Sequence, residues 1–304
     1  MIVVGGEALV DLVIDPDGSV TATLGGGPFN AARTIGRLGS DVVFLGALSH
    51  DRFGTLLHDR LLADGVRDDL VQFTELPTTL ASVELDGHGA ASYRFYISET
   101  AAPNLHPLPL PADLTMLHVG TLGLVLEPMA STLEAVVGGL ADEVLVLLDP
   151  NCRPRITSDR VGYLARLQRM LRRADIVKVS SDDLDFLADD QSAGVEMLLA
   201  GGARVVLHTD GGSGVHIHTT SGDVEVPVSV VEVADTIGAG DAFGGAFAAW
   251  WDQACLGRKD LGETDALRAA VEAAVEVAAI SCTRVGAQPP SRADLGGNWN
   301  PGRA

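Results

Sequence analysis

A glycine-rich stretch that ends in an aspartate, Asp235 to Asp241, carries the strongest chemical signal in the chain. Its small residues Gly238, Ala239 and Gly240 let the backbone approach a ligand closely and turn several N–H groups toward one point. The next ten residues are apolar and suit a helix, whose unpaired N–H groups attract an anion such as phosphate. A carboxylate there would repel the anion unless it takes a proton from an attacking hydroxyl, which indicates phosphoryl transfer. The alternative is an aspartate that only caps a helix after a glycine turn.

A second glycine-rich stretch, Gly25 to Gly27, precedes Pro28 and Asn30. Proline suits the first position of a helix, and three glycines allow close backbone approach at its start. Neither G-x-x-x-x-G-K-[ST] nor G-x-G-x-x-G occurs anywhere in the chain, which argues against those two nucleotide loops. A polar Asn30 at a glycine-lined opening favours a neutral, hydroxyl-rich ligand, although a plain loop is the alternative. Asp11, an acid inside an apolar run, is either an exposed strand end or a further contact for sugar hydroxyls.

The elements that must position these residues form an α/β pattern. Strands alternate with helices from Met116 to Thr209, which predicts a mainly parallel central sheet with helices on both faces. In such sheets ligands sit at the carboxyl ends of the strands. Three polar or glycine-rich segments fall at predicted strand ends, namely 149–153, 180–183 and 209–214. Each is weak alone, but together they indicate a ligand site along one edge of the sheet.

Two hairpins interrupt the first third of this pattern. One spans about 12–24 around Asp17-Gly18, and the other spans about 78–98 around Gly87-His88-Gly89. They predict a small β-sheet that stands off a single domain of residues 1–304. We expect this sheet to act as a lid that covers a ligand and excludes water. Its exposed face can also pair with a second subunit, so a homodimer through the lid is left open.

Composition excludes several classes of function. The formal net charge is -20 and the sequence has no block of Lys or Arg, so neither nucleic acid nor an anionic membrane is an expected partner. Three widely spaced cysteines have no metal-ligand spacing and fit a reducing compartment. The first residues lack a charged signal-peptide region, and no uncharged apolar run approaches the length of a membrane span. We therefore expect a cytoplasmic enzyme.

The chain resembles the ribokinase-like (PfkB) carbohydrate kinases over nearly its whole length. The resemblance rests on the glycine and asparagine region Gly25 to Gly39 and on D-T-x-G-A-G-D at Asp235 to Asp241. The T-x-G-x-x-G turn at Thr209 to Gly214 and the closing Gly286 to Pro289 add independent support. It implies a three-layer αβα kinase that transfers the γ-phosphate of ATP to a sugar hydroxyl.

The resemblance also implies roles for individual residues. Asp241 resembles the general base, and the N–H groups of Gly238, Ala239 and Gly240 resemble the anion hole. The implied substrate contacts are Asp11, Gly26, Gly27, Asn30, Arg94 and Arg153. The implied nucleotide contacts are Ser180, Asp183, Thr209, Gly211 and Gly214, with the helix near 266–283 beside the adenine. Positions that hold a monovalent cation such as K⁺ in some members match Asp235, Ile237, Ser281, Arg284 and Gly286.

One motif departs from the family pattern. The N-x-x-E motif that organises Mg²⁺ and phosphate through water is replaced here by Ser180-Ser181-Asp182-Asp183. Asp183 keeps the carboxylate, so the resemblance still implies dependence on Mg²⁺, held by Asp183 through water. The alternative is that Asp182 and Asp183 only open a helix.

The identity of the sugar rests on smaller similarities. The segments 6–11, 93–96, 118–122 and 149–153 look most like bacterial fructokinases, and Leu9 falls where ribokinases tend to have Asn. We therefore expect a primary hydroxyl of a ketose, fructose, as the acceptor. The 2-keto-3-deoxygluconate kinases share Glu7 and the 149–153 features, and there Arg153 can pair with a substrate carboxylate. That kinase, or another PfkB sugar kinase, is the nearest alternative.

Two further functions belong to other classes. A catalytically silent sugar- or nucleotide-binding protein on the same fold is opposed by the presence of Asp241 and both signatures. A nucleoside kinase is opposed by Arg94, Arg153 and the polar lid, which favour a sugar over a purine ring.

Overall fold

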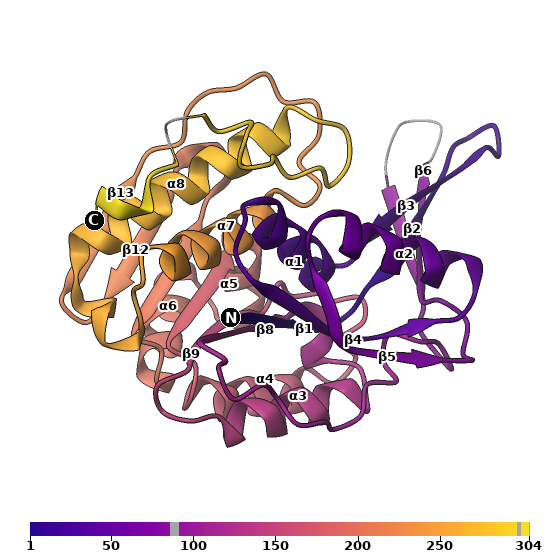
Figure 1. Ribbon diagram of the computed structural model, residues 1–304, viewed down its shortest axis with the longest axis horizontal. Helices are drawn as coiled ribbons and strands as arrows, with labels where there is room; N and C mark the ends of the chain where they lie inside the picture. The colour runs from indigo at the N-terminus through magenta and orange to yellow at the C-terminus, as the bar shows by residue number, and fades with distance from the viewer. Residues whose placement is uncertain (86–90, 297–298, 304) are drawn as a thin grey trace.

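The computed structural model describes residues 1–85, 91–296 and 299–303, and the turn expected at Gly87 to Gly89 lies outside them. A nine-stranded sheet runs through the molecule in the order β13-β12-β11-β10-β9-β8-β1-β4-β5 (Figure 1). All neighbours pair in parallel except β11 with β12 and β12 with β13. The strands are β1 (Ile2–Gly5), β4 (Val42–Ser49), β5 (Arg67–Thr74), β8 (Met116–Gly120), β9 (Leu145–Asp149), β10 (Ile176–Ser180), β11 (Val205–Thr209), β12 (Val215–Thr219) and β13 (Gly222–Val226). The central strands are continuous apolar runs because both faces of the sheet are covered.

Helices cover both faces of this sheet. One face carries α1 (Gly27–Arg37), α2 (Arg52–Ala63), α7 (Ala239–Gln253) and α8 (Thr264–Cys282). The other carries α3 (Met129–Gly139), α4 (Arg160–Leu171), α5 (Ser181–Leu187) and α6 (Gln191–Gly201). The apolar side chains accordingly form two clusters, one on each side of the sheet. This arrangement confirms the expected three-layer αβα fold. Among the described residues, no helix has the length and apolar character that a membrane span needs.

A separate four-stranded sheet has the order β3-β2-β6-β7. Its strands are β2 (Leu9–Ile14), β3 (Val20–Gly25), β6 (Leu80–Leu85) and β7 (Ala91–Tyr96), and it projects from one end of the molecule (Figure 1). The pairs β2–β3 and β6–β7 are antiparallel, while β2 and β6 run in parallel. The two expected hairpins therefore join into one small sheet; that it acts as a lid stays a prediction.

The approach to the Asp235–Asp241 stretch differs from expectation. The last strand before it, β13, ends at Val226. Pro227 follows, and because proline has no N–H it cannot continue the ladder. The helix α7 begins at Ala239 rather than at 242, so Gly240 and Asp241 lie in its first turn.

The connections of β1 fix where a ligand can sit. From β1 the chain builds β4 and β5 on one side, then returns to place β8, β9, β10 and β11 on the other. The direction of winding therefore reverses between β1 and β8. A crevice forms beyond the carboxyl ends of strands at such a switch point, and Glu7, Thr121 and Asn151 all follow strand ends there.

Candidate active site

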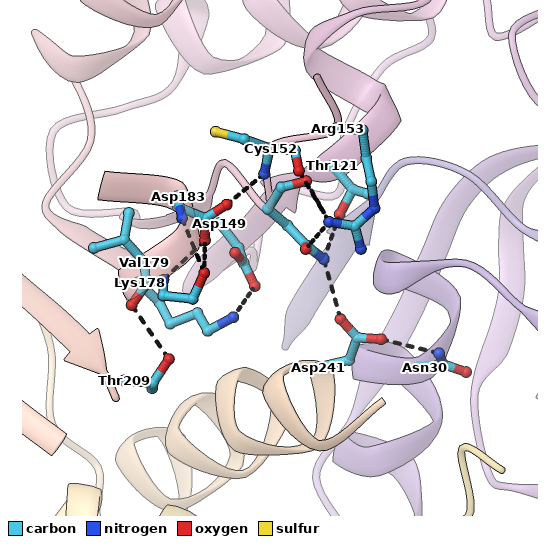
Figure 2. Close-up of polar contacts among 12 residues, drawn as sticks. Asn30, Thr121, Asp149, Cys152, Arg153, Lys178, Val179, Asp183, Thr209 and Asp241 are labelled. Carbon is cyan, nitrogen blue, oxygen red and sulfur yellow. Dashed lines mark hydrogen bonds and ion pairs between the residues drawn. The ribbon is translucent and has the colours of Figure 1, made fainter. Parts of the chain in front are cut away.

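Two amide side chains hold the carboxylate of Asp241 in place (Figure 2). Asn30, in the first turn of α1, donates from Nδ2 to Asp241 Oδ2 at 2.9 Å. Asn151, which follows β9, approaches Asp241 Oδ1 at 3.5 Å and Thr121 Oγ1 at 3.4 Å through its Nδ2. The backbone of Asn151 has φ 38°, a left-handed conformation that asparagine tolerates better than most residues. The two amides come from segments that are distant in the sequence, and together they fix the orientation of Asp241.

The surroundings of Asp241 suit a group that accepts a proton. Burial raises the pKa of the carboxyl above its ordinary value, against the smaller opposing effects of the Asn30 hydrogen bond and the charges of Lys178 and Arg153. The residue nevertheless keeps part of its surface exposed. An accessible carboxylate with a raised pKa is a better general base at neutral pH than an ordinary surface aspartate.

The start of α7 offers fewer free amides than the sequence predicts. Ala239 N–H donates to Thr236 O at 3.2 Å, so in this structure the amide that the sequence assigns to the anion hole is already hydrogen-bonded. In the described part of the chain, the N–H groups of Gly238, Gly240 and Asp241 have no hydrogen-bond partner. A tight turn before the helix causes this difference, with Gly238 in the left-handed region at φ 76°. The amides available to an anion are therefore those on either side of Ala239.

The second glycine stretch lines the opposite wall of the crevice. Gly27 N–H donates to Glu7 Oε1 at 3.1 Å. A Cβ atom at Gly27 would lie 2.5 Å from Thr121 Oγ1 and 3.2 Å from Asp241 Oδ1, so only glycine fits between them. Gly26, at φ 109°, packs its backbone directly on Glu7. Asn30 and Gly27 are thus brought to Asp241, with Gly26 beside them, and their contact with a sugar stays a prediction.

Acidic groups crowd this wall. Burial, together with the charge of Asp241, raises the pKa of Glu7 to about 8, although two backbone hydrogen bonds and Arg153 oppose the shift. Burial also raises the pKa of Asp11, on β2, to about 6, against the charge of Arg153. The crevice therefore presents a dense array of oxygen acceptors of the kind that bind sugar hydroxyls.

The two candidate arginines occupy different places. Arg153 donates through Nη1 to Asn151 Oδ1 at 2.6 Å and to the carbonyls of Asn151 and Cys152, each at 3.1 Å. Its charge acts on Asp241, Glu7 and Asp11, which places it at the crevice. Arg94 lies on β7 of the small sheet, opposite Ser82 on β6, and is exposed.

The candidate nucleotide residues gather at the ends of β10 and β11. Ser180 caps α5, and Asp183 returns the contact by accepting from Ser180 N at 2.8 Å and Ser180 Oγ at 2.7 Å. The other oxygen of Asp183 accepts from Cys152 N, and the residue is 3% exposed. Asp183 thus serves as a helix cap, the alternative considered above, and any role with Mg²⁺ must share its oxygens with these donors.

The turn after β11 lies beside that cap. Thr209 Oγ1 donates to Val179 O at 3.3 Å, which ties the two strand ends together (Figure 2). Asp210 N–H donates to Gly214 O at 2.9 Å to close the turn. Gly211 and Gly214 adopt φ 50° and 132°, which favour glycine. The structure therefore brings Thr209, Gly211 and Gly214 next to Ser180.

Metal ligands are not preassembled in this region. Among the described residues, no group of three or more His, Cys, Asp or Glu side chains is arranged to hold a metal ion. Magnesium in kinases needs only one or two carboxylates because substrate phosphates supply the other ligands. Asp149 fits that requirement: its Oδ1 is buried and has no hydrogen-bond partner among the residues that the structure describes, while its Oδ2 accepts from Lys178 Nζ at 3.1 Å.

The segments predicted to hold a monovalent cation lie side by side. Asp235 accepts from Ile237 N at 3.0 Å and from Gly286 N at 2.8 Å, and Arg284 N–H donates to Ser281 O at 3.1 Å. Ser281 Oγ is buried and has no partner among the described residues. An unpartnered buried hydroxyl among backbone carbonyls is compatible with an ion such as K⁺, although the donor set alone does not select it.

Several residues of the site were given no individual role from the sequence, although Asp149 and Asn151 lie in the 149–153 segment that the sequence places at the ligand site. Glu7, Thr121, Asp149, Asn151 and Lys178 all contact it directly. Four of them stand at predicted strand ends, where polar residues are common, so only the topology reveals that they converge. Lys178 could have been found in another way. A charged lysine inside the otherwise apolar strand Ile176–Ser180 is unusual and indicates a functional role.

A glycine-rich helix start with an amide-held aspartate in its first turn, at the switch point of a three-layer αβα fold, matches the ribokinase-like class of sugar phosphotransferases. The chain belongs to the pfkB family of carbohydrate kinases, whose family model matches residues 1–294. This confirms the resemblance that the motifs suggested.

Individual relatives agree with that assignment. The chain is 36% identical over 252 residues to a fructokinase of Rhizobium leguminosarum bv. trifolii, an alignment that covers 80% of this chain and 77% of the relative. It superposes with a TM-score of 0.87 and 30% identity on a Xylella fastidiosa fructokinase with bound ATP, over 94% of this chain and 93% of that one. It superposes with a TM-score of 0.86 and 26% identity on a Vibrio cholerae O395 fructokinase double mutant in a form with bound fructose, ADP and potassium ion, over 98% of both chains.

Proposed function

We propose that this enzyme transfers the γ-phosphate of ATP to a primary hydroxyl of fructose. The observation that carries the proposal is the position of Asp241. Asn30 holds it at 2.9 Å, beside the N–H groups of Gly238 and Gly240, which have no partner within 1–85, 91–296 and 299–303. A base and an anion site within one turn of helix are what phosphoryl transfer to a hydroxyl requires. The fructokinase relatives support the same acceptor.

The proposed chemistry uses the residues of the crevice directly. The acceptor hydroxyl gives its proton to Asp241, and its oxygen forms a new bond to the terminal phosphorus of ATP. The bond from that phosphorus to the β,γ-bridging oxygen breaks, and the electron pair leaves with ADP. The N–H groups of Gly238 and Gly240 stabilise the charge on the transferred group. Bound Mg²⁺ would neutralise phosphate charge, with Asp149 Oδ1 and Asp183 as its carboxylates through water.

The other contacts are assigned from position and resemblance together. Asp11, Gly26, Gly27 and Asn30 line the wall opposite the anion site and would bind sugar hydroxyls, with Arg153 beside them and Arg94 on the small sheet. Ser180, Thr209, Gly211 and Gly214 would bind the nucleotide. Asp235, Ile237, Ser281, Arg284 and Gly286 would surround K⁺.

The charge of the crevice favours a neutral sugar over an acidic one. Glu7, Asp11 and Asp241 all face it, and Arg153 is the cation that acts on all three. A substrate carboxylate would meet the like charges of Asp11 and Asp241, while Glu7, with a pKa of about 8, holds its proton at neutral pH. Arg153 already donates through Nη1 to Asn151 and Cys152. This balance places fructose ahead of 2-keto-3-deoxygluconate.

A coupled assay of ADP release tests the proposal. We expect the highest kcat/KM with fructose and MgATP, in a comparison with ribose, tagatose, 2-keto-3-deoxygluconate and adenosine. A higher kcat/KM with 2-keto-3-deoxygluconate or adenosine would assign a different kinase. If calorimetry detects sugar binding but no acceptor releases ADP, the protein is a silent binder.

The small sheet has a second proposed role. We infer that residues 1–304 form one domain and that the small sheet, as well as covering the sugar, pairs with that of another subunit. Val20 and Tyr96 are 57% and 50% exposed on this sheet, which supports a contact there. Sedimentation velocity with Val20→Glu checks this: the wild type should sediment as a dimer and the variant as a monomer.

A further inference from the structure

Lys178 places a buried positive charge next to the start of α7. It lies on β10, and its side chain is 5% exposed. Its ammonium donates to Asp149 Oδ2 at 3.1 Å, which is its one hydrogen bond in the described part of the chain. An ammonium has three N–H donors. Two donors of a buried cation therefore remain for another partner.

The direction of the side chain identifies where that partner would be. A Cβ atom placed on Gly240 would lie 2.9 Å from Lys178 Nζ, so the ammonium touches the first turn of α7. Figure 2 shows the Lys178 side chain running along α7, between Asp149 and the helix. The unpartnered N–H group of Gly240 belongs to the same turn. The cation and the free amides thus face one region.

Lys178 and Asp149 form a buried ion pair, and each of the two side chains is 5% exposed. A buried ion pair seldom stabilises a fold more than apolar residues of equal volume, because both charges lose their hydration. Packing alone therefore gives no reason for a lysine at this position, whereas an anionic ligand would.

We propose that Lys178 is a catalytic residue that donates a hydrogen bond to the phosphoryl group in transfer, and that Asp149 is the residue that positions it. The inference rests on the proposed kinase function. As the bond from the terminal phosphorus to the bridging oxygen breaks and the bond to the sugar oxygen forms, the ammonium stabilises the charge on the phosphoryl oxygens. It neither gains nor loses a proton. This chain has Ser180 where the N-x-x-E motif has an asparagine. Lys178, two residues before Ser180, would supply a hydrogen-bond donor to the phosphate.

Substitution tests the role. The variant Lys178→Met removes the charge and keeps Asp149, the proposed Mg²⁺ contact. We expect its kcat at saturating Mg²⁺ to fall about 10²–10³-fold, while the Kd of fructose measured by calorimetry stays within about threefold. Because Lys178→Met leaves the Asp149 carboxylate unpaired, the double variant Lys178→Met with Asp149→Asn is also made and is compared with Asp149→Asn alone, which separates the loss of Lys178 from the loss of the Mg²⁺ contact. Lys259→Met is the matched control, because Lys259 is the second of the two lysines in the chain and is exposed. It should retain wild-type kcat.

The small number of lysines permits a direct observation. Protein labelled with ¹⁵N-lysine should give two side-chain ammonium signals, which the Lys259→Met variant assigns. The Lys178 signal should shift when the non-hydrolysable β,γ-methylene analogue of ATP binds with Mg²⁺ and fructose, and should shift less with ADP, which lacks the terminal phosphate. A folded Lys178→Met variant with kcat within about threefold of the wild type would overturn the proposal, as would a double variant as active as Asp149→Asn or identical Lys178 signals with the two nucleotides.

These outcomes separate the inference from the proposed function. If wild-type protein releases no ADP with fructose, the kinase assignment fails before any variant is compared. If the wild type is active and Lys178→Met is equally active, only the role of Lys178 fails.

Discussion

Asn30 Nδ2 lies 2.9 Å from Asp241 Oδ2, a hydrogen bond between residues that are 211 positions apart in the chain. It joins the first turn of α1 to the first turn of α7, and these two helices pack on the same face of the sheet. The base of the proposed reaction is therefore oriented by the helix that also presents the glycine wall of the sugar site.

Asp241 itself is the first residue to test. The variant Asp241→Asn keeps the size of the side chain but cannot accept the hydroxyl proton. We expect kcat with fructose to fall about 10²–10⁴-fold, with an unchanged thermal midpoint. The control Asp189→Asn, at an exposed position after α5, should keep full activity. An active Asp241→Asn enzyme would contradict the assignment of the base.

Loss of the amide at position 30 should change both rate and pH profile. The Asn30 hydrogen bond opposes the effect of burial on the pKa of Asp241, so Asn30→Leu raises that pKa further. A general base is lost as pH falls through its pKa, so the acid limb of kcat/KM should move to higher pH. At neutral pH we expect a loss of about 10–100-fold, the equivalent of the roughly 1.5–3 kcal/mol of a hydrogen bond to a charged group. An acid limb at the wild-type position would show that Asn30 does not act on Asp241.

Gly27 should tolerate no side chain. In Gly27→Ala the new Cβ atom would lie 2.5 Å from Thr121 Oγ1, and relief of that contact displaces the groups around Asp241. We expect a loss of about 1–3 kcal/mol in stability and at least a tenfold rise in KM for fructose. Gly138→Ala, an exposed position near the end of α3 with open space around it, is the matched control and should be as stable as the wild type or more so. Equal behaviour of the two variants would show that the crevice accommodates the methyl group.

Glu7 should make stability depend on pH above the usual carboxylate range. Its pKa rises from an ordinary value of 4.5 to about 8 in the fold, so the folded protein holds a proton that the unfolded chain releases. The resulting stabilisation is complete below about 4.5 and is lost as pH rises through 8. In Glu7→Gln this loss is absent, so the stability of the variant relative to wild type should grow by up to about 1.4 kcal/mol per pH unit. Urea unfolding at several pH values between 5 and 8 measures it, and a constant difference would refute the buried proton.

Fructose should slow hydrogen exchange in the small sheet. If β2, β3, β6 and β7 close over the sugar, their amides gain protection while those of α3, on the far face of the central sheet, do not. Mass spectrometry with and without saturating fructose makes the comparison. Unchanged exchange in all four strands would mean that the sheet does not act as a lid.

The sequence predicted the layers and the two glycine stretches because both follow from local rules. Alternating strand and helix patterns define the sheet, and the stretch with Gly238 and Gly240 can be recognised from its own residues, without information on distant ones. The contacts across the crevice are different in kind. Asn151 reaches Asp241 and Thr121 only because β8 and β9 end beside α7. The hydrogen bond that occupies the Ala239 amide depends on the turn at Thr236. Polar residues at strand ends carry no mark that separates a ligand contact from an ordinary turn.

The junction between β3 and α1 has a mechanical consequence. The strand ends at Gly25 and the helix begins at Gly27, so Gly26 alone separates the outer sheet from the helix that carries Asn30. A hinge of one residue cannot absorb a large rotation without passing some of it on. If the strands of the small sheet moved to bind a sugar, the movement would therefore reach Asn30 through the backbone. Sugar binding and the alignment of Asp241 by Asn30 would then be a single movement.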